Sequence, residues 1–297
     1  MIKTVMATPW ALLQTMRPRQ WTKNAFVFVA LIFDKKLFDP PSVVRTFIAF
    51  GLLCLIASAV YIMNDLSDIE SDRQHPRKRN RPLPSGRLSP RVAIVAAILF
   101  AVGSLAASFV MDPLFGLILL TYLLSQIAYT YWLKHKVLLD IFIVAAGFVL
   151  RIAAGVAVIE VERFSPWLYV FGGFLALFLV LGKRRHELRL LGDGADSHRA
   201  VLQHYNLDLI DRLIGIVTTS AVVAYSLYTF LAEGLPDNHV MMFTIPVVLY
   251  IVFRYLYLIH VRDEGGTPED ILLRDRPMQA GLLFGALLVF LALYVLS

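Results

Sequence analysis

Nine apolar runs, separated by short or charged segments, restrict this chain to very few folds. Hydrophobic residues make up 58% of its 297 positions and charged residues 17%, whereas a soluble domain is about half apolar and a quarter charged. A transmembrane helix needs about 20 consecutive apolar residues. We therefore predict an all-α integral membrane protein of about nine transmembrane helices, forming a single integral membrane domain over residues 1–297. The predicted spans are 23–33, 43–63, 92–111, 113–132, 137–159, 167–181, 210–231, 240–259 and 278–296.

The lysines and arginines are distributed unevenly among the loops. Of the 28, 22 fall in one set of alternate loops and four in the other, while Arg151 and Arg254 lie inside spans. Because short cytoplasmic loops are enriched in basic residues, we expect a multi-pass plasma-membrane protein with its amino terminus in the cytoplasm and its carboxyl terminus outside. Residues 4–11 are too polar for the core of a signal peptide, so we expect this terminus to be retained. The first span is short, and we expect it to extend back toward Trp10.

Three aspartates follow the second span at a helical spacing. Asp65, Asp68 and Asp72 stand at i, i+3 and i+7, which on a continuous helix places them within an arc of about 60°. Carboxylates on one face repel one another unless they share a cation, and Mg²⁺ takes oxygen ligands that include substrate phosphates. We therefore predict that these three residues bind Mg²⁺ and are catalytic, on the cytoplasmic face. The alternative is a solvated helix end.

A basic segment follows these aspartates directly. Five cations lie between positions 73 and 81. A metal on one side and direct cation contacts on the other are what binding of a diphosphate requires. We therefore predict substrate contacts for Arg73, Lys78, Arg79 and Arg81. An anchor that touches anionic lipid headgroups is the alternative.

Two charged residues fall in the fifth span. Arg151 lies more than two turns inside it, where an unpaired charge costs at least about 3 kcal/mol. Asp140 is in phase with Arg151 but roughly 16 Å away along the helix axis, too far for direct contact. We predict that Asp140 lines a substrate cavity and that Arg151 binds a phosphate or carboxylate deeper in the membrane. An ion pair with another helix is the open alternative for Arg151.

Further cations near the expected cytoplasmic face are candidate ligands. Lys134 follows Tyr131 by three residues, on the same side of a continuous helix, and we predict that it contacts a diphosphate. An interfacial belt of aromatic and basic residues is the alternative. Arg19 and Lys23, near the start of the first span, are expected to contact lipid headgroups or an acceptor phosphate.

Other kinds of chemistry have no support in the sequence. The seven histidines are scattered, without a paired metal-binding spacing. The single cysteine, Cys54, excludes an internal disulfide. No nucleic-acid-binding module is recognisable. The predicted site therefore depends on oxygen ligands and cations.

The motif Asn-Asp-x-x-Asp-x-x-x-Asp, here Asn64, Asp65, Asp68 and Asp72, resembles that of the UbiA superfamily of intramembrane prenyltransferases. That superfamily has an all-helical bundle of nine spans. More narrowly, the chain resembles the decaprenyl-phosphate phosphoribosyltransferase branch in five blocks. These are Arg17-Pro18-Arg19-Gln20-Trp21 with Lys23-Asn24, Asp72-Arg73 with His75-Pro76 and Lys78-Arg79, Leu133-Lys134-His135 with Asp140-Ile141, Gly182-Lys183-Arg184 with Glu187-Leu188, and Pro268-Glu269-Asp270-Ile271 with Leu273-Arg274-Asp275-Arg276.

The chain departs from the aromatic prenyltransferases of this superfamily after the sixth span. Those enzymes carry a second aspartate-rich motif there for a second metal, whereas this chain has Lys183, Arg184 and Arg185. The resemblance thus implies that Lys183 and Arg184 bind another anion directly, such as the 5-phosphate of 5-phosphoribosyl 1-diphosphate. The alternative is the cytoplasmic bias of basic residues together with a helical pair between Lys183 and Glu187.

The resemblance implies a Mg²⁺-dependent polyprenyl-phosphate phosphoribosyltransferase. Such an enzyme transfers 5-phosphoribose from 5-phosphoribosyl 1-diphosphate to polyprenyl phosphate, releases diphosphate and makes a lipid-linked pentose precursor of cell-wall arabinan. Asn64 would join the substrate-binding residues, membrane lipid would be a partner, and assembly into a homo-oligomer stays open. Two alternatives remain: a transferase that moves a prenyl group from its diphosphate to an aromatic acceptor, and a lipid or ion transporter that catalyses no reaction.

Overall fold

The computed structural model describes residues 2–76, 78–159, 161, 164–191, 200–236, 238–264, 266, 271 and 274–296, and all regular structure among them is helical. Eight helical segments are long and apolar enough to cross a membrane. This confirms the predicted all-helical membrane fold. The segments are α3 (Pro40–Ser67), α5 (Pro90–Met111), α6 (Pro113–Tyr131), α7 (Leu139–Val158), α8 (Pro166–Leu191), α9 (Leu207–Leu231), the 3₁₀ turn η5 (Val240–Thr244) with α10 (Ile245–His260), and α12 (Arg276–Phe290) with a π-helical turn (Leu291–Val295).

The segment predicted as the first span is broken into three pieces: α1 (Ile2–Met16), the 3₁₀ helix η1 (Pro18–Val27) and the short α2 (Phe28–Phe33). Arg17 has a positive φ of 54°, and a following proline disfavours the α conformation. The expectation of one helix over 23–33 that extends toward Trp10 is therefore wrong. Instead, η1 carries Asn24 to a buried position.

An aspartate followed directly by a proline begins two of the long helices, α3 and α6. Asp39 precedes Pro40 and accepts a hydrogen bond from the Ser42 amide at 3.1 Å. Asp112 precedes Pro113 and accepts one from the Phe115 amide at 2.7 Å. An N-cap carboxylate and a proline in the first turn both stabilise a helix start. These pairs fix where the membrane helices begin.

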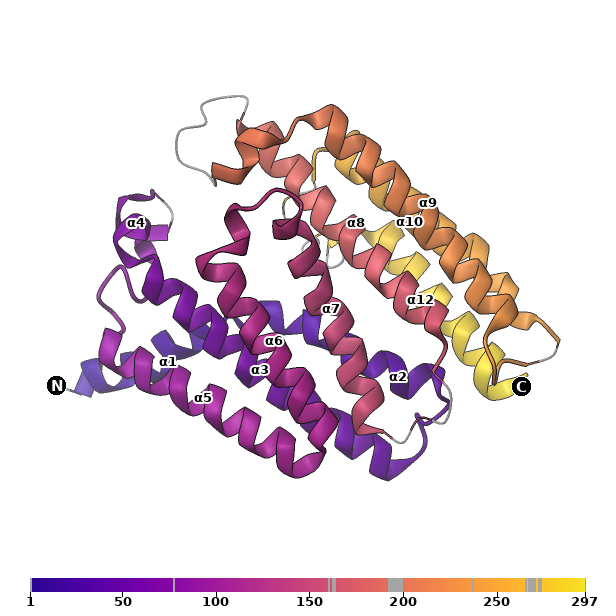
Figure 1. Ribbon diagram of the computed structural model, residues 1–297, viewed down its shortest axis with the longest axis horizontal. Coiled ribbons are helices and arrows are strands. Elements are labelled where there is room, and N and C mark those ends of the chain that lie inside the picture. Colours follow the sequence, from indigo (N-terminus) through magenta and orange to yellow (C-terminus); the bar gives the residue numbers. More distant parts are fainter. Residues whose placement is uncertain are drawn as a thin grey trace.

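The helices form two groups that meet along α7 and α8 (Figure 1). One group contains α1, α3, α5, α6 and α7, and the other contains α8, α9, α10 and α12. Each group has its own buried apolar cluster. The first includes Leu53, Ile56, Phe115, Leu119 and Val158, and the second includes Phe178, Leu181, Ile210, Ile214 and Tyr255.

The charged segments gather at one end of this bundle. The short helix α4 (Ile69–Gln74), the connection from α6 to α7 and the start of α9 lie at the top of Figure 1. The connection from α5 to α6 and the carboxyl terminus lie at the opposite end. The fold therefore brings segments distant in sequence to one mouth of the bundle.

At Gly155, α7 approaches η1 closely. A Cβ atom on Gly155 would lie 2.1 Å from the carbonyl oxygen of Val27. Only glycine permits this approach, because it has no side chain. The contact holds η1 against α7, where Asn24 meets Arg151.

Candidate active site

The helix that carries the aspartates is interrupted at Asp68. α3 ends at Ser67, α4 begins at Ile69, and Asp68 between them has φ −103° and ψ 9°. The break is confined to this residue, because the Asp68 amide still donates to the Asn64 carbonyl at 3.1 Å and the Asp72 amide to the Asp68 carbonyl at 2.8 Å, as in an α-helix. The prediction of three aspartates along one face of a continuous helix is therefore wrong.

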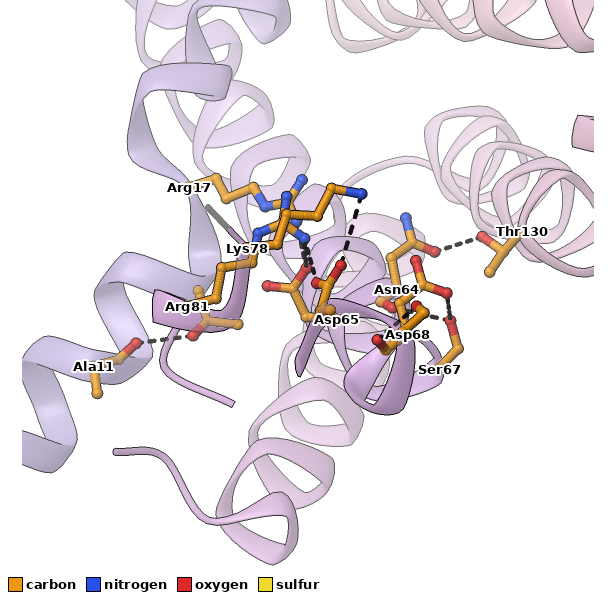
Figure 2. Close-up of polar contacts among 12 residues, drawn as sticks. Ala11, Arg17, Asn64, Asp65, Ser67, Asp68, Lys78, Arg81 and Thr130 are labelled. Atoms are coloured by element: carbon orange, nitrogen blue, oxygen red, sulfur yellow. Dashed lines mark hydrogen bonds and ion pairs between the residues drawn. The ribbon is translucent and has the colours of Figure 1, made fainter. Parts of the chain in front are cut away.

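Asp65 and Asp72 lie in a cluster with three cations, and Figure 2 shows Asp65 facing Arg17, Lys78 and Arg81. Arg81 Nη1 is 3.2 Å from Asp65 Oδ1 and 2.7 Å from Asp72 Oδ2. Arg17 pairs with Asp65, and Lys78 Nζ is 3.7 Å from Asp72 Oδ1. Both aspartates are 2% exposed, so their charges depend on these partners. We call these five residues the carboxylate–cation cluster. It has three positive and two negative side chains.

Asp68 lies apart from this cluster, beside Asn64. In Figure 2, Asp68 is on the side of Ser67 and Thr130, whereas Asp65 faces the cations. Asp68 Oδ1 accepts from Ser67 Oγ at 3.1 Å, and Asn64 Oδ1 accepts from Thr130 Oγ1 at 2.6 Å. Among the described residues, no ion pair reaches Asp68. We call Asn64 and Asp68 the oxygen pair.

The described residues contain no group of three His, Cys, Asp or Glu side chains placed to hold a metal ion. Asp65, Asp68 and Asp72 thus do not form the common metal-binding face that the sequence predicts. The physical reason is local: the cations of the neighbouring segments neutralise Asp65 and Asp72, while the break in the helix leaves Asp68 with Asn64.

The other predicted basic ligands lie outside the carboxylate–cation cluster. Arg73 is exposed and pairs with Glu70 at 2.7 Å. Arg19 and Arg79 are exposed, and Lys23 Nζ donates to Gln20 Oε1 at 2.7 Å. Lys134 is half-buried on the 3₁₀ turn η3 (Leu133–His135).

Because α6 ends at Tyr131, Lys134 does not share a helix face with that residue, contrary to the prediction. The block 268–276 lies largely outside the described residues.

Asp140 and Arg184 bind each other. Asp140 is fully buried, and its carboxylate accepts from Arg184 Nε at 3.0 Å and from the Tyr205 hydroxyl at 2.7 Å. Arg184 also pairs with Glu187 at 2.5 Å. The arginine predicted to bind an anion is therefore held by two carboxylates of the chain itself. Lys183 precedes it on α8 and is half-buried.

Tyr205 connects this ion pair to the Lys134 segment. Its hydroxyl accepts from the Leu138 amide at 2.7 Å while it donates to Asp140. Burial raises the pKa of Tyr205 to about 12, so the hydroxyl stays protonated at neutral pH. Leu138 has a positive φ of 66°, and this hydrogen bond holds its backbone at the start of α7.

Arg151 is 5% exposed and makes three hydrogen bonds to neutral groups. Nε donates to Asn24 Oδ1 at 2.7 Å, Nη1 to the Gly147 carbonyl at 2.6 Å, and Nη2 to the Tyr122 hydroxyl at 3.0 Å. No ion pair joins Arg151 to a carboxylate in the described part of the chain. The alternative of an ion pair between helices is therefore wrong there.

Sequence reasoning missed several neighbours of these charges. Tyr122, Gln126 and Thr130 stand at i, i+4 and i+8 of an apolar helix, a spacing that places them on one face. That polar stripe was a usable signal. No sequence pattern pointed to Tyr205, because only the tertiary structure brings its hydroxyl to Asp140.

Known proteins resemble this chain over nearly all its length. It is 33% identical over 272 residues to "Decaprenyl-phosphate phosphoribosyltransferase" of Mycobacterium tuberculosis, covering 90% of this chain and 88% of that one. It is 29% identical over 290 residues to the protein of the same name from Corynebacterium glutamicum, covering 96% and 87%. A UbiA homolog from Archaeoglobus fulgidus, solved with GPP and Mg²⁺, has the same fold, with a TM-score of 0.71, 19% identity and coverage of 96% and 100%. Residues 24–272 match the UbiA prenyltransferase family, and the chain therefore belongs to that family.

Proposed function

We propose that this protein transfers 5-phosphoribose from 5-phosphoribosyl 1-diphosphate to a polyprenyl phosphate and releases diphosphate. The product is a lipid-linked pentose, which we propose serves as a precursor of cell-wall arabinan. Relatives that carry the name decaprenyl-phosphate phosphoribosyltransferase align with almost all of this chain and support the choice of donor and acceptor. The chain is a UbiA-family transferase in a membrane-spanning bundle.

The observation that carries this proposal is the arrangement at the mouth of the bundle. The carboxylate–cation cluster has one more positive than negative side chain, and Arg17, Arg81 and Lys78 keep 31%, 32% and 42% of their side chains exposed. Each guanidinium has five N–H donors, so Arg17 and Arg81 can keep their carboxylate partners while their remaining N–H groups bind a phosphate. The oxygen pair lies beside them. A diphosphate therefore meets cations on one side and oxygen ligands for a metal on the other.

The oxygen pair fits Mg²⁺. Asn64 Oδ1 and the Asp68 carboxylate are hard oxygen donors one helical turn apart. Asp68 has only a serine hydroxyl as a side-chain partner among the described residues. Mg²⁺ usually binds through one or two protein oxygens and completes its coordination with water and phosphate. We propose that Asn64 and Asp68 hold the ion, while Asp65 and Asp72 orient the cations.

The reaction breaks the bond between C1 of ribose and the diphosphate oxygen, and the bonding electrons leave with diphosphate. A phosphate oxygen of the lipid forms the new bond to C1 from the opposite face. Bound Mg²⁺ supplies charge neutralisation for the leaving diphosphate. Arg17, Lys78 and Arg81 bind and orient the same group. The acceptor needs no general base, because a phosphate monoester loses its second proton near pH 6.

We also propose that the mouth faces the cytoplasm in the plasma membrane. The loop of residues 73–91 carries seven of the basic residues, and basic loops favour the cytoplasmic side. This orientation puts the site where a water-soluble donor is available. The polyprenyl tail of the acceptor stays in the bilayer.

A transfer assay tests this function. Purified full-length protein is incubated with 5-phosphoribosyl 1-diphosphate labelled in the ribose, decaprenyl phosphate and Mg²⁺. We expect label in the organic phase, and none with decaprenol or with EDTA. A parallel arm offers geranyl diphosphate with 4-hydroxybenzoate. Prenylation there without ribose transfer would replace the proposal with an aromatic prenyltransferase, and no product in either arm would reject both.

A further inference from the structure

Arg151 is a buried cation whose described hydrogen-bond partners are all neutral. Asn24, Gly147 and Tyr122 accept three hydrogen bonds from it, and a guanidinium has five N–H donors. A buried charge is normally paired with an opposite charge, because it has lost the stabilisation of water. Arg151 therefore has both the donors and the uncompensated charge to bind an anion.

Gly147 brings the backbone of α7 close to this guanidinium. A Cβ atom on Gly147 would lie 3.3 Å from Arg151 Nη1, 3.5 Å from Gln126 Nε2 and 3.6 Å from Tyr122 Cε2. A charged donor and an amide nitrogen thus lie together against the Gly147 backbone, beside an aromatic ring. Guanidinium and amide N–H groups are common ligands of phosphate oxygens. We call Asn24, Tyr122, Gln126, Gly147 and Arg151 the Arg151 cradle.

The Arg151 cradle lies deeper in the bundle than the oxygen pair. Thr130, the partner of Asn64, is eight residues after Tyr122 on α6, which corresponds to about 12 Å along the axis. Gly147 is seven residues after Asp140 on α7, or about 10 Å. Tyr122, Gln126 and Thr130 lie on one face of α6. A polar path therefore connects the cradle to the mouth within two membrane-spanning helices.

We infer that the Arg151 cradle binds the phosphate of the polyprenyl phosphate acceptor. This inference rests on the proposed function and assigns its second subsite. The donor carries a phosphate monoester too, at its 5-position. The lipid phosphate is the better match because the cradle lies inside the membrane-spanning part of α6 and α7.

This placement agrees with the geometry of the transfer. The donor's diphosphate lies at the mouth, so a lipid phosphate in the cradle approaches the ribose from the membrane side. Nucleophile and leaving group are then on opposite faces of C1, as the displacement requires. The negative charge of the phosphate monoester compensates Arg151.

Direct binding to the purified full-length protein in detergent tests the inference. The probes are decaprenyl phosphate, decaprenol and 5-phosphoribosyl 1-diphosphate, each titrated by microscale thermophoresis. Arg151→Met removes the charge, and Gly147→Ala places a methyl group 3.3 Å from Arg151 Nη1, so that the guanidinium must shift. The matched controls are Arg45→Met, an arginine that donates to the Val158 carbonyl, and Gly103→Ala, where a Cβ meets nothing within 4 Å.

We expect Arg151→Met to raise the Kd for decaprenyl phosphate at least tenfold and Gly147→Ala to raise it severalfold. The Kd values for decaprenol and for the donor should not change, and both controls should match the wild type. Equal affinity for decaprenyl phosphate in the wild type and both variants would overturn the inference. Weakened binding of the donor instead would assign the cradle to the 5-phosphate and overturn it as well.

The test gives a result even if one variant does not fold or if the wild type shows no transfer. If Arg151→Met fails to fold, Gly147→Ala decides, because it keeps the charge and alanine favours a helix over glycine. Binding does not require transfer, so an inactive wild type would reject the proposed function without affecting this measurement. Where transfer occurs, Arg151→Met should raise KM for the lipid at least tenfold and leave KM for the donor unchanged.

Discussion

Thr130 on α6 donates a hydrogen bond of 2.6 Å to the Oδ1 atom of Asn64 on α3. A carbonyl oxygen has two lone pairs, so Asn64 Oδ1 keeps one for a second partner. Asp68 is one helical turn further along, at the end of the same helix. The contact between α6 and α3 therefore fixes an oxygen atom beside the carboxylate that we propose binds Mg²⁺.

Replacing Thr130 with valine should weaken binding of the metal. The variant keeps the size of the side chain but loses the hydrogen bond to Asn64, and one hydrogen bond contributes about 0.5–1.5 kcal/mol. We expect the Mg²⁺ concentration for half-maximal transfer to rise by about two- to tenfold. A Mg²⁺ titration of the initial rate measures this. Thr130→Ser keeps the hydroxyl and should behave as the wild type, whereas an unchanged Mg²⁺ requirement in Thr130→Val would contradict the role of this contact.

Replacing Asp68 with asparagine should reduce transfer by at least about 100-fold, because removal of one electrostatic ligand of the transition state typically costs 10²–10³ in rate. Asp68 is partly exposed and pairs with no cation among the described residues, so the fold should be retained. The initial rate and the thermal unfolding midpoint measure the two effects separately. Glu70→Gln is the matched control, since Glu70 is exposed and pairs only with Arg73 among the described residues. Full activity in Asp68→Asn would remove Asp68 from the metal site.

The membrane fold was predictable because its signal is spread over long segments. Apolar runs such as 92–111 and 113–132 coincide with α5 and α6 to within two residues, since aspartate, serine and proline mark the helix starts. The first span was not predictable in the same way. Its apolar residues suggested one helix, but Pro18 and the close contact of Val27 with Gly155 break the segment into shorter pieces.

The sequence predicted which charged residues gather at the candidate site, but it did not predict which of them contact one another. The sequence placed Asp65, Asp72 and Arg81 near one another at the same membrane exit, and in the structure Arg81 forms ion pairs with both aspartates. It also predicted substrate contacts for Asp140 and Arg184, which stay a prediction, and it did not indicate that these residues bind each other across 44 residues of sequence. Helical periodicity orders side chains along one element, whereas contacts between helices depend on packing that no local pattern contains.

Lowering the pH should loosen the contact between α10 and α12. Arg254 donates to both carboxylate oxygens of Asp275, at 3.1 and 2.8 Å. This hydrogen bonding lowers the pKa of Asp275 below its ordinary value. A carboxylate with a lowered folded pKa stabilises the protein above its unfolded pKa, about 3.9 for aspartate, and this stability is lost as the pH falls through the folded value.

We therefore expect the thermal unfolding midpoint in detergent to fall between pH 5 and pH 3, through protonation of Asp275 together with other carboxylates. Asp275→Asn lacks the carboxylate at every pH. Its midpoint should be lower than that of the wild type at pH 5, and the difference should shrink toward pH 3. A difference that is constant with pH would show that the ionisation of Asp275 does not contribute to stability, and would contradict this prediction.

Replacing Gly155 with alanine should separate η1 from α7. The new Cβ would lie 2.1 Å from the Val27 carbonyl oxygen, and a backbone atom cannot rotate away as a side chain can. Overpacking costs about 1–3 kcal/mol, which exceeds the gain of roughly 0.5–1 kcal/mol from replacing a helical glycine. We expect a lower thermal unfolding midpoint and, because Asn24 moves away from Arg151, weaker binding of decaprenyl phosphate. Gly103→Ala, in α5, meets nothing within 4 Å, so it should leave binding unchanged and should not lower the midpoint. Equal midpoints for the two variants would mean that η1 can shift away from α7 without loss of stability.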